Sequence, residues 1–152
     1  MARNNANLTT SVEVAAAVAA FKTILQWVAP AGIIVAIQGV DLSFDGVSNT
    51  GEPVQWELIR QTTAGTGGTA RNPLKTKDTS TALQSTGLEN IVTTEPTAGD
   101  ILAAGHIHPQ AGMLNPLPLP DGEIEIAGAG RLGLRINAPA AVNCRATMRG
   151  EE

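Results

Sequence analysis

The sequence predicts an all-β fold, an antiparallel β-sandwich or jelly roll with roughly eight to ten strands. Glycine (16 residues) and proline (9 residues) are plentiful, whereas charged residues make up only 16% of the 152 positions. Helix-rich soluble domains usually carry more Glu, Lys and Leu and fewer turn-forming residues. Short segments of alternating apolar and polar residues also recur between turn residues, a pattern typical of half-buried strands. The length suits one domain with a core of its own.

The alternation is clearest in the last 32 residues, where the inward side chains of three expected strands all fall on even positions. Successive side chains of a strand point to opposite faces, so these strands have one apolar face and one polar, charged face. The even-numbered apolar residues are Ile124, Ile126, Leu132, Leu134, Ile136, Val142, Cys144, Ala146 and Met148.

A three-stranded meander satisfies this pattern. If Ile126 faces Leu132, then Glu123 faces Arg135, and opposite charges pair on the outer face. If Ile136 faces Val142 across the next turn, all three strands present their even positions to one core. Such cross-strand pairs contribute about 0.2–1 kcal/mol each.

The N-terminal part is less regular. Residues 1–10 are polar and are expected to form a flexible arm, which leaves residues 11–152 as the sandwich domain. From Val12 to Val28, an alanine run followed by Pro30 is compatible with an amphipathic helix. The same segment also reads as strands, with Phe21 and Trp27 on one face. Periodicity does not separate the two readings, and the composition of the whole chain favours strands.

The middle of the chain predicts several more strands. Residues 33–44 are rich in β-branched side chains, and in the segment from Val54 to Leu58 apolar residues alternate with polar ones. Further strands are expected around residues 81–84, 88–92 and 101–108. Between them lie a turn (Asp45–Pro53), a flexible glycine-rich loop (Ala64–Ala70) and a proline-rich connection (Asn115–Glu123), whose prolines do not fit central strands.

Composition argues against several classes of partner. The formal net charge is −4, aromatic residues are 3% and tyrosine is absent. Nucleic-acid binding needs clustered Lys and Arg, and binding of single strands or polysaccharides normally uses stacking aromatics. No segment approaches the ~20 apolar residues that span a bilayer, and the N-terminus does not resemble a secretion signal. With Cys144 as the only cysteine, the chain forms no intrachain disulfide and suits a reducing cytoplasm.

His106 and His108 are the two residues of the chain that most suggest a metal site. At i and i+2 they share a strand face and could bind a metal, with Asp100, Asp121 or Glu123 as a third ligand. No second spacing supports such a site, and Pro109 indicates that the strand ends there. We therefore interpret the pair as a polar strand end and predict no metal, no cofactor and no catalytic residue.

Other candidates are weaker. The AGTGGTA segment (64–70) lacks the helix and the GK[ST] ending of a phosphate-binding loop. Arg71, Lys75 and Lys77 form a small basic cluster that is either solvated surface or a dock for an acidic partner. None of the serines (Ser11, Ser43, Ser48, Ser80, Ser85) lies in a nucleophile elbow. Cys144 falls on an apolar strand face, so we expect a core side chain and not a thiolate.

Three segments of the chain resemble small structural proteins of tailed bacteriophages. They read GVDLSFDGVSNTGEPVQWELIRQTTAGTGGTA, TTEPTAGDILAAGHIHPQAG and PLPDGEIEIAGAGRLGLRINAPAAVNCRATMRGEE, and within the last, GRLGLRINAPAAVN is the most specific pattern. The resemblance runs from about Ser11 to Glu152. It implies a jelly-roll-like capsid decoration, or cement, protein that binds outside the assembled head, often as a homotrimer, and braces the major capsid protein.

Two alternatives stay open at this stage. One is a tail or head-fibre component of the virion, and the other is a cupin-like metal-dependent enzyme, which would need His106 and His108 inside a barrel. The role of the leucine-rich loop before the final strands is also undecided. Its apolar residues either pack between copies in a trimer or close the end of a monomeric sandwich; they are Met113, Leu114, Leu117 and Leu119.

Overall fold

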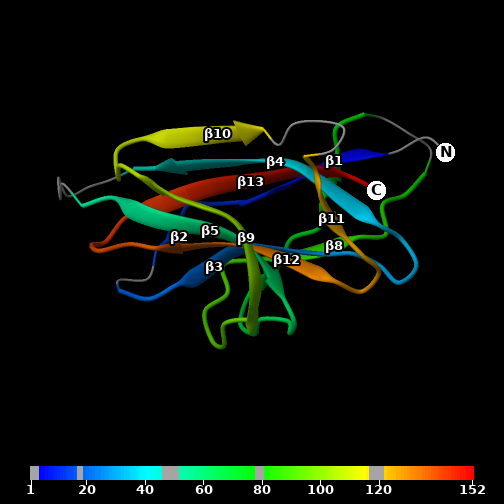
Figure 1. Ribbon diagram of the computed structural model, residues 1–152, viewed down its shortest axis with the longest axis horizontal. Coiled ribbons are helices and arrows are strands. Elements are labelled where there is room, and N and C mark those ends of the chain that lie inside the picture. Colours follow the sequence, from blue (N-terminus) through cyan, green and yellow to red (C-terminus); the bar gives the residue numbers. More distant parts are fainter. Residues whose placement is uncertain (1–3, 17–18, 46–51, 78–80, 117–121) are drawn as a thin grey trace.

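The computed structural model describes residues 4–16, 19–45, 52–77, 81–116 and 122–152 and shows a β-sandwich (Figure 1). These residues form thirteen strands and no helix. The strands are β1 (Asn5–Thr9), β2 (Val14–Ala15), β3 (Lys22–Val28), β4 (Val35–Phe44), β5 (Val54–Gln61), β6 (Thr69–Ala70), β7 (Leu74–Lys75), β8 (Thr86–Glu89), β9 (Ala98–Ile107), β10 (Gly112–Pro116), β11 (Ile124–Ile126), β12 (Arg131–Asn137) and β13 (Asn143–Glu151). The predicted fold class is confirmed, with somewhat more strands than expected.

Two antiparallel sheets make up the sandwich. The seven-stranded sheet has the order β10-β4-β13-β1-β7, with β11 also paired to β4 and β2 to β13. The six-stranded sheet has the order β6-β8-β3-β12-β5-β9. In Figure 1 the first sheet forms the upper layer and the second the lower one. Nearly all neighbours in each sheet are distant in the sequence, so the chain crosses repeatedly between layers.

The expected C-terminal meander is wrong about which strands pair, but right about which side chains point into the core. β11 pairs with β4, β12 pairs with β3 and β5 in the other sheet, and β13 pairs with β4 and β1. Of the nine even-numbered apolar residues named above, eight are nevertheless buried in one core, and Ile124 packs against it. Strands from opposite sheets of a sandwich share the same interior, so an alternating pattern satisfies either arrangement equally well.

The expected flexible arm is also wrong for the residues that the structure describes. β1 lies inside the seven-stranded sheet, paired with β13 along its whole length and with β7 on its other side. Ala6 and Leu8 are fully buried, and Asn5 and Asn7 are only half-buried. The burial alternates with period two, as it does in the other strands.

The ambiguous segment from Val12 to Val28 contains strands β2 and β3, as the composition favoured, although residues 17–18 lie outside the described part. With Phe21 and Trp27 on one face, a regular alternation would place Ile24 on the other face. The pairing shifts at this point: Leu134 faces Leu25, but Arg135 faces Thr23. The extra residue in β3 is a β-bulge, which allows Ile24 and Leu25 both to enter the core.

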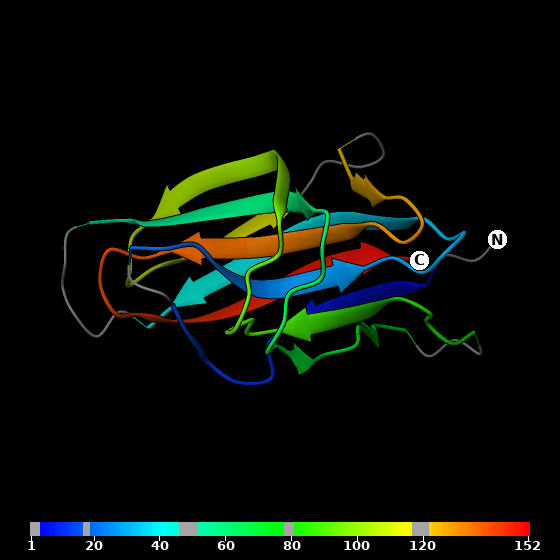
Figure 2. The same cartoon turned by 90° about the horizontal axis from the view of Figure 1, so that it is seen from below.

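Part of the outer face of the six-stranded sheet is covered by the chain itself. Two loops, residues 62–68 and 90–97, cross in front of this sheet in Figure 2 and hydrogen-bond to each other between Thr66 and Thr94. Beneath them Ile59 and Ile91 are buried apart from the main core. Gln61 Nε2 donates to Thr23 Oγ1 (3.0 Å) and Gln26 Nε2 donates to Gln61 Oε1 (2.7 Å), so these buried polar side chains are hydrogen-bonded.

Candidate functional site

The two histidines lie at the end of β9 and just beyond it. His106 lies on β9 opposite Gln55 and lines a shallow hollow, and His108 follows the end of the strand. Both side chains are exposed, and His108 Nδ1 accepts a hydrogen bond from the backbone N–H of Gln110 (3.2 Å). Within the described ranges no three His, Cys, Asp or Glu residues are grouped so that they could hold a metal ion. Asp121 lies outside those ranges. A cupin-like site needs its histidines inside a barrel, whereas these two histidines lie exposed at the surface.

The basic cluster is partly used for structure. Arg71 Nε donates to the backbone carbonyl of Thr9 (2.8 Å) and so fixes the end of β1. Lys75 lies on β7 opposite Ala6, and Lys77 is exposed beyond it. Arg71 and Lys75 therefore lie beside β1, on the edge where it pairs with β7.

The glycine-rich loop is packed and does not form a phosphate cradle. A Cβ on Gly65 would lie 2.3 Å from the side chain of Ile91, and one on Gly67 would lie 2.1 Å from that of Thr93. Gly67 also has a φ of 74°, which favours glycine. The loop lies this close because it covers the six-stranded sheet, so the expectation of a flexible segment is wrong for residues 64–70.

Cys144 is a core residue, as predicted. It lies on β13 and is buried in the apolar interior. Burial raises the pKa of its thiol to about 12, because the thiolate would lose its hydration there. Among the serines, Ser11 donates from both its backbone N–H and its hydroxyl to the carboxylate of Glu89, which ties the β1–β2 loop to the other sheet. Ser48 and Ser80 lie outside the described residues.

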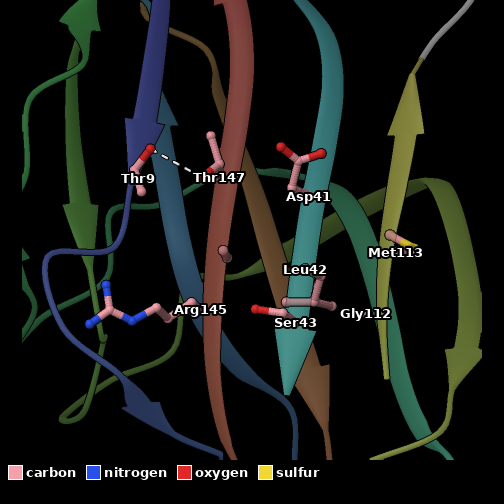
Figure 3. A pocket seen from close by; sticks show the side chains of 9 residues that line it. Thr9, Asp41, Leu42, Ser43, Gly112, Met113, Arg145 and Thr147 are labelled. Carbon is pink, nitrogen blue, oxygen red and sulfur yellow. Dashed lines mark hydrogen bonds between the residues drawn. The ribbon is translucent and has the colours of Figure 1, made fainter. Parts of the chain in front are cut away.

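The most distinctive surface is the outer face of the seven-stranded sheet, where side chains of β1, β13 and β4 stand side by side (Figure 3). Thr9, Thr147 and Asp41 form one row across the three strands, because Thr147 pairs with both of the others. Arg145 and Ser43 form the next row. We call these five residues the polar face.

Side chains of the polar face are held by one another. The hydroxyls of Thr9 and Thr147 hydrogen-bond at 3.1 Å. Arg149, one row further along β13, binds the carboxylate of Asp41 through two nitrogens, with Nε at 3.1 Å from Oδ2. Arg145 and Ser43 are exposed. Residues of the polar face, with Gly112 and Met113 of β10, line a shallow hollow of about 290 Å³.

The free edge of the six-stranded sheet is the second surface of interest. β9 is ten residues long, and among the described strands it has a neighbour on one side only, β5. Two of its large apolar side chains are open to solvent: Ile101 is 55% exposed and Leu102 is 37% exposed. Natural sheets rarely leave a long apolar edge strand uncovered.

The leucine-rich loop is described only in part. Met113 packs against the core and so favours the reading in which this end of the sandwich is closed by its own residues. Leu117 and Leu119 lie outside the described residues, and the choice between the two readings for them stays open.

Sequence reasoning did not find either surface. The polar face joins residues more than 100 positions apart, such as Thr9 and Thr147, and it depends on strand order, which alternation does not encode. The edge position of β9 depends on strand order too. One signal was readable for β1, where Ala6 and Leu8 alternate with Asn5, Asn7 and Thr9.

No helix that could span a membrane occurs in the part of the chain that the structure describes. Comparisons with protein-family models, with curated proteins and with solved structures gave no match.

Proposed function

We propose that this chain is a non-enzymatic structural protein of a tailed-bacteriophage virion, a capsid decoration protein that binds the outside of the assembled head and stabilises it. Its partners in this proposal are the major capsid protein and further copies of itself in a homotrimer. The sequence resemblance supplies this class of function. The structural observation that supports it best is the uncovered polar face.

A protein that lies on a shell needs a broad, ordered surface and a rigid body behind it. The two faces of this sandwich differ in that respect. Loops of the chain cover part of the outer face of the six-stranded sheet, while Arg145 and Ser43 on the other sheet are exposed. The polar face is thus the side of the sandwich that is available to a large partner.

The hydrogen bonds within the polar face favour such binding. Association costs about 0.5–1.5 kcal/mol for each flexible side chain that becomes ordered. Thr9, Thr147 and Asp41 already have fixed partners, so part of that cost is met before binding. Non-obligate interfaces are about as polar as the rest of a protein surface and commonly hold bridging water, which suits a face of hydroxyls and charges.

Co-sedimentation with capsids tests the proposal. Expanded heads of the parent phage, prepared without this protein, are mixed with the purified chain and pelleted. We expect saturable binding, and we expect decorated heads to break at a higher temperature than bare ones. If the wild-type chain stays in the supernatant with such heads, the proposed function is wrong.

A matched pair of variants tests the polar face. Ser43→Glu adds one negative charge to this face, and Thr94→Glu adds one to the loops over the other sheet; both positions are exposed. We expect weaker binding of heads for Ser43→Glu only. Equal binding of the two variants would remove the polar face as the docking surface.

A further inference from the structure

The polar face carries one positive charge that the protein does not use for its own structure. Arg145 is exposed, and no residue that the structure describes forms a hydrogen bond or an ion pair with its guanidinium. Figure 3 shows the Arg145 side chain extending from β13 away from Asp41 and Ser43. Arg149, on the same strand, is held by the carboxylate of Asp41, and together they are neutral. The excess charge of this face therefore lies at Arg145.

Two acidic residues lie near Arg145 but do not neutralise it. Glu13 and Asp45 line a smaller hollow that Arg145 also borders. Asp45 accepts hydrogen bonds from the backbone N–H and the side-chain amide of Asn143, at 3.0 and 3.1 Å. Within the described residues, neither carboxylate forms an ion pair with Arg145. The guanidinium is thus available to a carboxylate from outside the chain.

The surface beside Arg145 has room for a side chain of a partner. Ser43 lies opposite Arg145 on β4, and Gly112 lies opposite Ser43 on β10. This row has one long side chain followed by two small positions, which leaves the shallow hollow open. The Ser43 hydroxyl also has no hydrogen-bond partner among the described residues. An unpaired cation, an unpaired hydroxyl and open space therefore lie in one row of the polar face.

We propose that Arg145 binds an acidic side chain, an Asp or Glu carboxylate, on the surface of the major capsid protein. The inference rests on the proposed function and names the chemistry of its partner. A guanidinium donates two parallel N–H groups to a carboxylate, which makes the pair stronger and more directional than a lysine contact. One isolated cation suits a single carboxylate, whereas a nucleic acid would require clustered cations and is disfavoured by the net charge of −4.

A matched pair of charge-removing variants tests the contact. Arg145→Gln and Lys77→Gln each remove one exposed positive charge, and Lys77 lies beyond the edge strand β7 and away from the polar face. Binding to undecorated heads is measured by co-sedimentation at low and at high NaCl concentration. We expect Arg145→Gln to bind about tenfold more weakly at low salt, because it leaves the carboxylate unpaired. It should also lose most of the salt dependence, since salt screens charged contacts, whereas Lys77→Gln should match the wild type.

Modified heads test the chemistry of the partner. Carbodiimide with glycinamide converts exposed carboxylates of the heads into neutral amides. We expect wild type and Arg145→Gln to bind such heads equally weakly. If the wild type keeps its advantage, the group that Arg145 meets is not a carboxylate and the proposal is overturned. Light scattering of the chain without heads gives a second check, because a smaller mass for Arg145→Gln than for the wild type would place Arg145 between copies of the chain instead.

Failure of this inference is distinguishable from failure of the proposed function. If the wild type does not bind untreated heads, the proposed function is wrong and the inference with it. If the wild type binds and Arg145→Gln binds equally well, or if Lys77→Gln loses as much affinity, only the role of Arg145 is refuted. Circular dichroism checks that both variants are folded.

Discussion

Glu57 on β5 and Arg135 on β12 lie directly opposite each other and form an ion pair, with Arg135 Nη2 2.6 Å from Glu57 Oε2. The side chains are only 6% and 18% exposed respectively, and the guanidinium also lies 4.1 Å from the centre of the Phe21 ring. Three segments distant in the sequence therefore meet at Arg135. From the sequence, Arg135 was expected to face Glu123, so the charge pair exists with a different partner.

Replacing one member of this pair should destabilise the fold. Glu57→Ala leaves Arg135 without its carboxylate in a largely buried position, and we expect a loss of about 2 kcal/mol in the free energy of unfolding, below the 3–5 kcal/mol of a fully buried pair. Urea denaturation followed by tryptophan fluorescence measures it. Glu123→Ala is the control, because the expected meander would have made that residue the partner; an equal loss for both variants would contradict the observed pairing.

β1 supplies a second test, because it was expected to be flexible. Leu8 is fully buried between the sheets, so Leu8→Ala should cost about 2–5 kcal/mol from lost burial and the cavity left behind. Asn7→Ala changes the neighbouring residue on the outer face and should cost far less. If both substitutions had the same small effect on urea denaturation, β1 would not be part of the folded sheet.

The raised pKa of Cys144 predicts that the protein loses stability at alkaline pH. Its folded pKa is raised from 9.0 to about 12, so between these values the native state holds a proton that the unfolded state releases. Stability is therefore fully present below about pH 9 and falls as pH rises toward 12, by up to about 1.4 kcal/mol per pH unit. The chain has no tyrosine, so no phenol group titrates in the same range.

The Cys144→Ala variant isolates this effect. It should show a flatter decline in the free energy of unfolding between pH 9 and 10.5 than the wild type. In the native wild type at pH 8, a thiol reagent should modify Cys144 only as fast as the protein unfolds. Rapid modification without unfolding would show that the thiol is accessible.

Substitutions at Gly133 and Gln61 are expected to be energetically coupled. A Cβ on Gly133 would lie 2.3 Å from Gln61 Cδ, so Gly133→Ala must push this side chain out of its hydrogen bonds to Thr23 and Gln26. We expect a cost of about 1–3 kcal/mol, as in other overpacked sites. In a Gln61→Ala background the added methyl group has room, so Gly133→Ala should cost less there. Additive effects in the double-mutant cycle would mean that the two positions are independent.

Local patterns were enough to predict the strand character of most segments and the inward side chains of the last ones. Leu132, Leu134 and Ile136 are all buried, as their spacing predicted. Irregular positions were not predictable. Ile24 breaks the alternation of β3 because of a bulge, and a bulge depends on what the neighbouring strand requires.

The candidate surfaces were less accessible to sequence reasoning than the core. The histidines stood out because they are chemically reactive, yet both lie exposed at one end of the sandwich. Thr9, Asp41 and Thr147 drew no attention, because such side chains are common on any surface. Their significance comes from standing in one row on three neighbouring strands.

The sequence by itself determined that this protein is an all-β sandwich, which side chains of its last strands point inward, and that Cys144 belongs to the core. Those properties follow from the two-residue period of a strand and from the free energy gained by burying apolar side chains, and both act locally along the chain. Only the tertiary structure decided that β1 is an inner strand, that Arg135 pairs with Glu57, and that β9 is left at an edge. Strand order is decided by contacts between distant segments, and one alternating pattern is compatible with many neighbours.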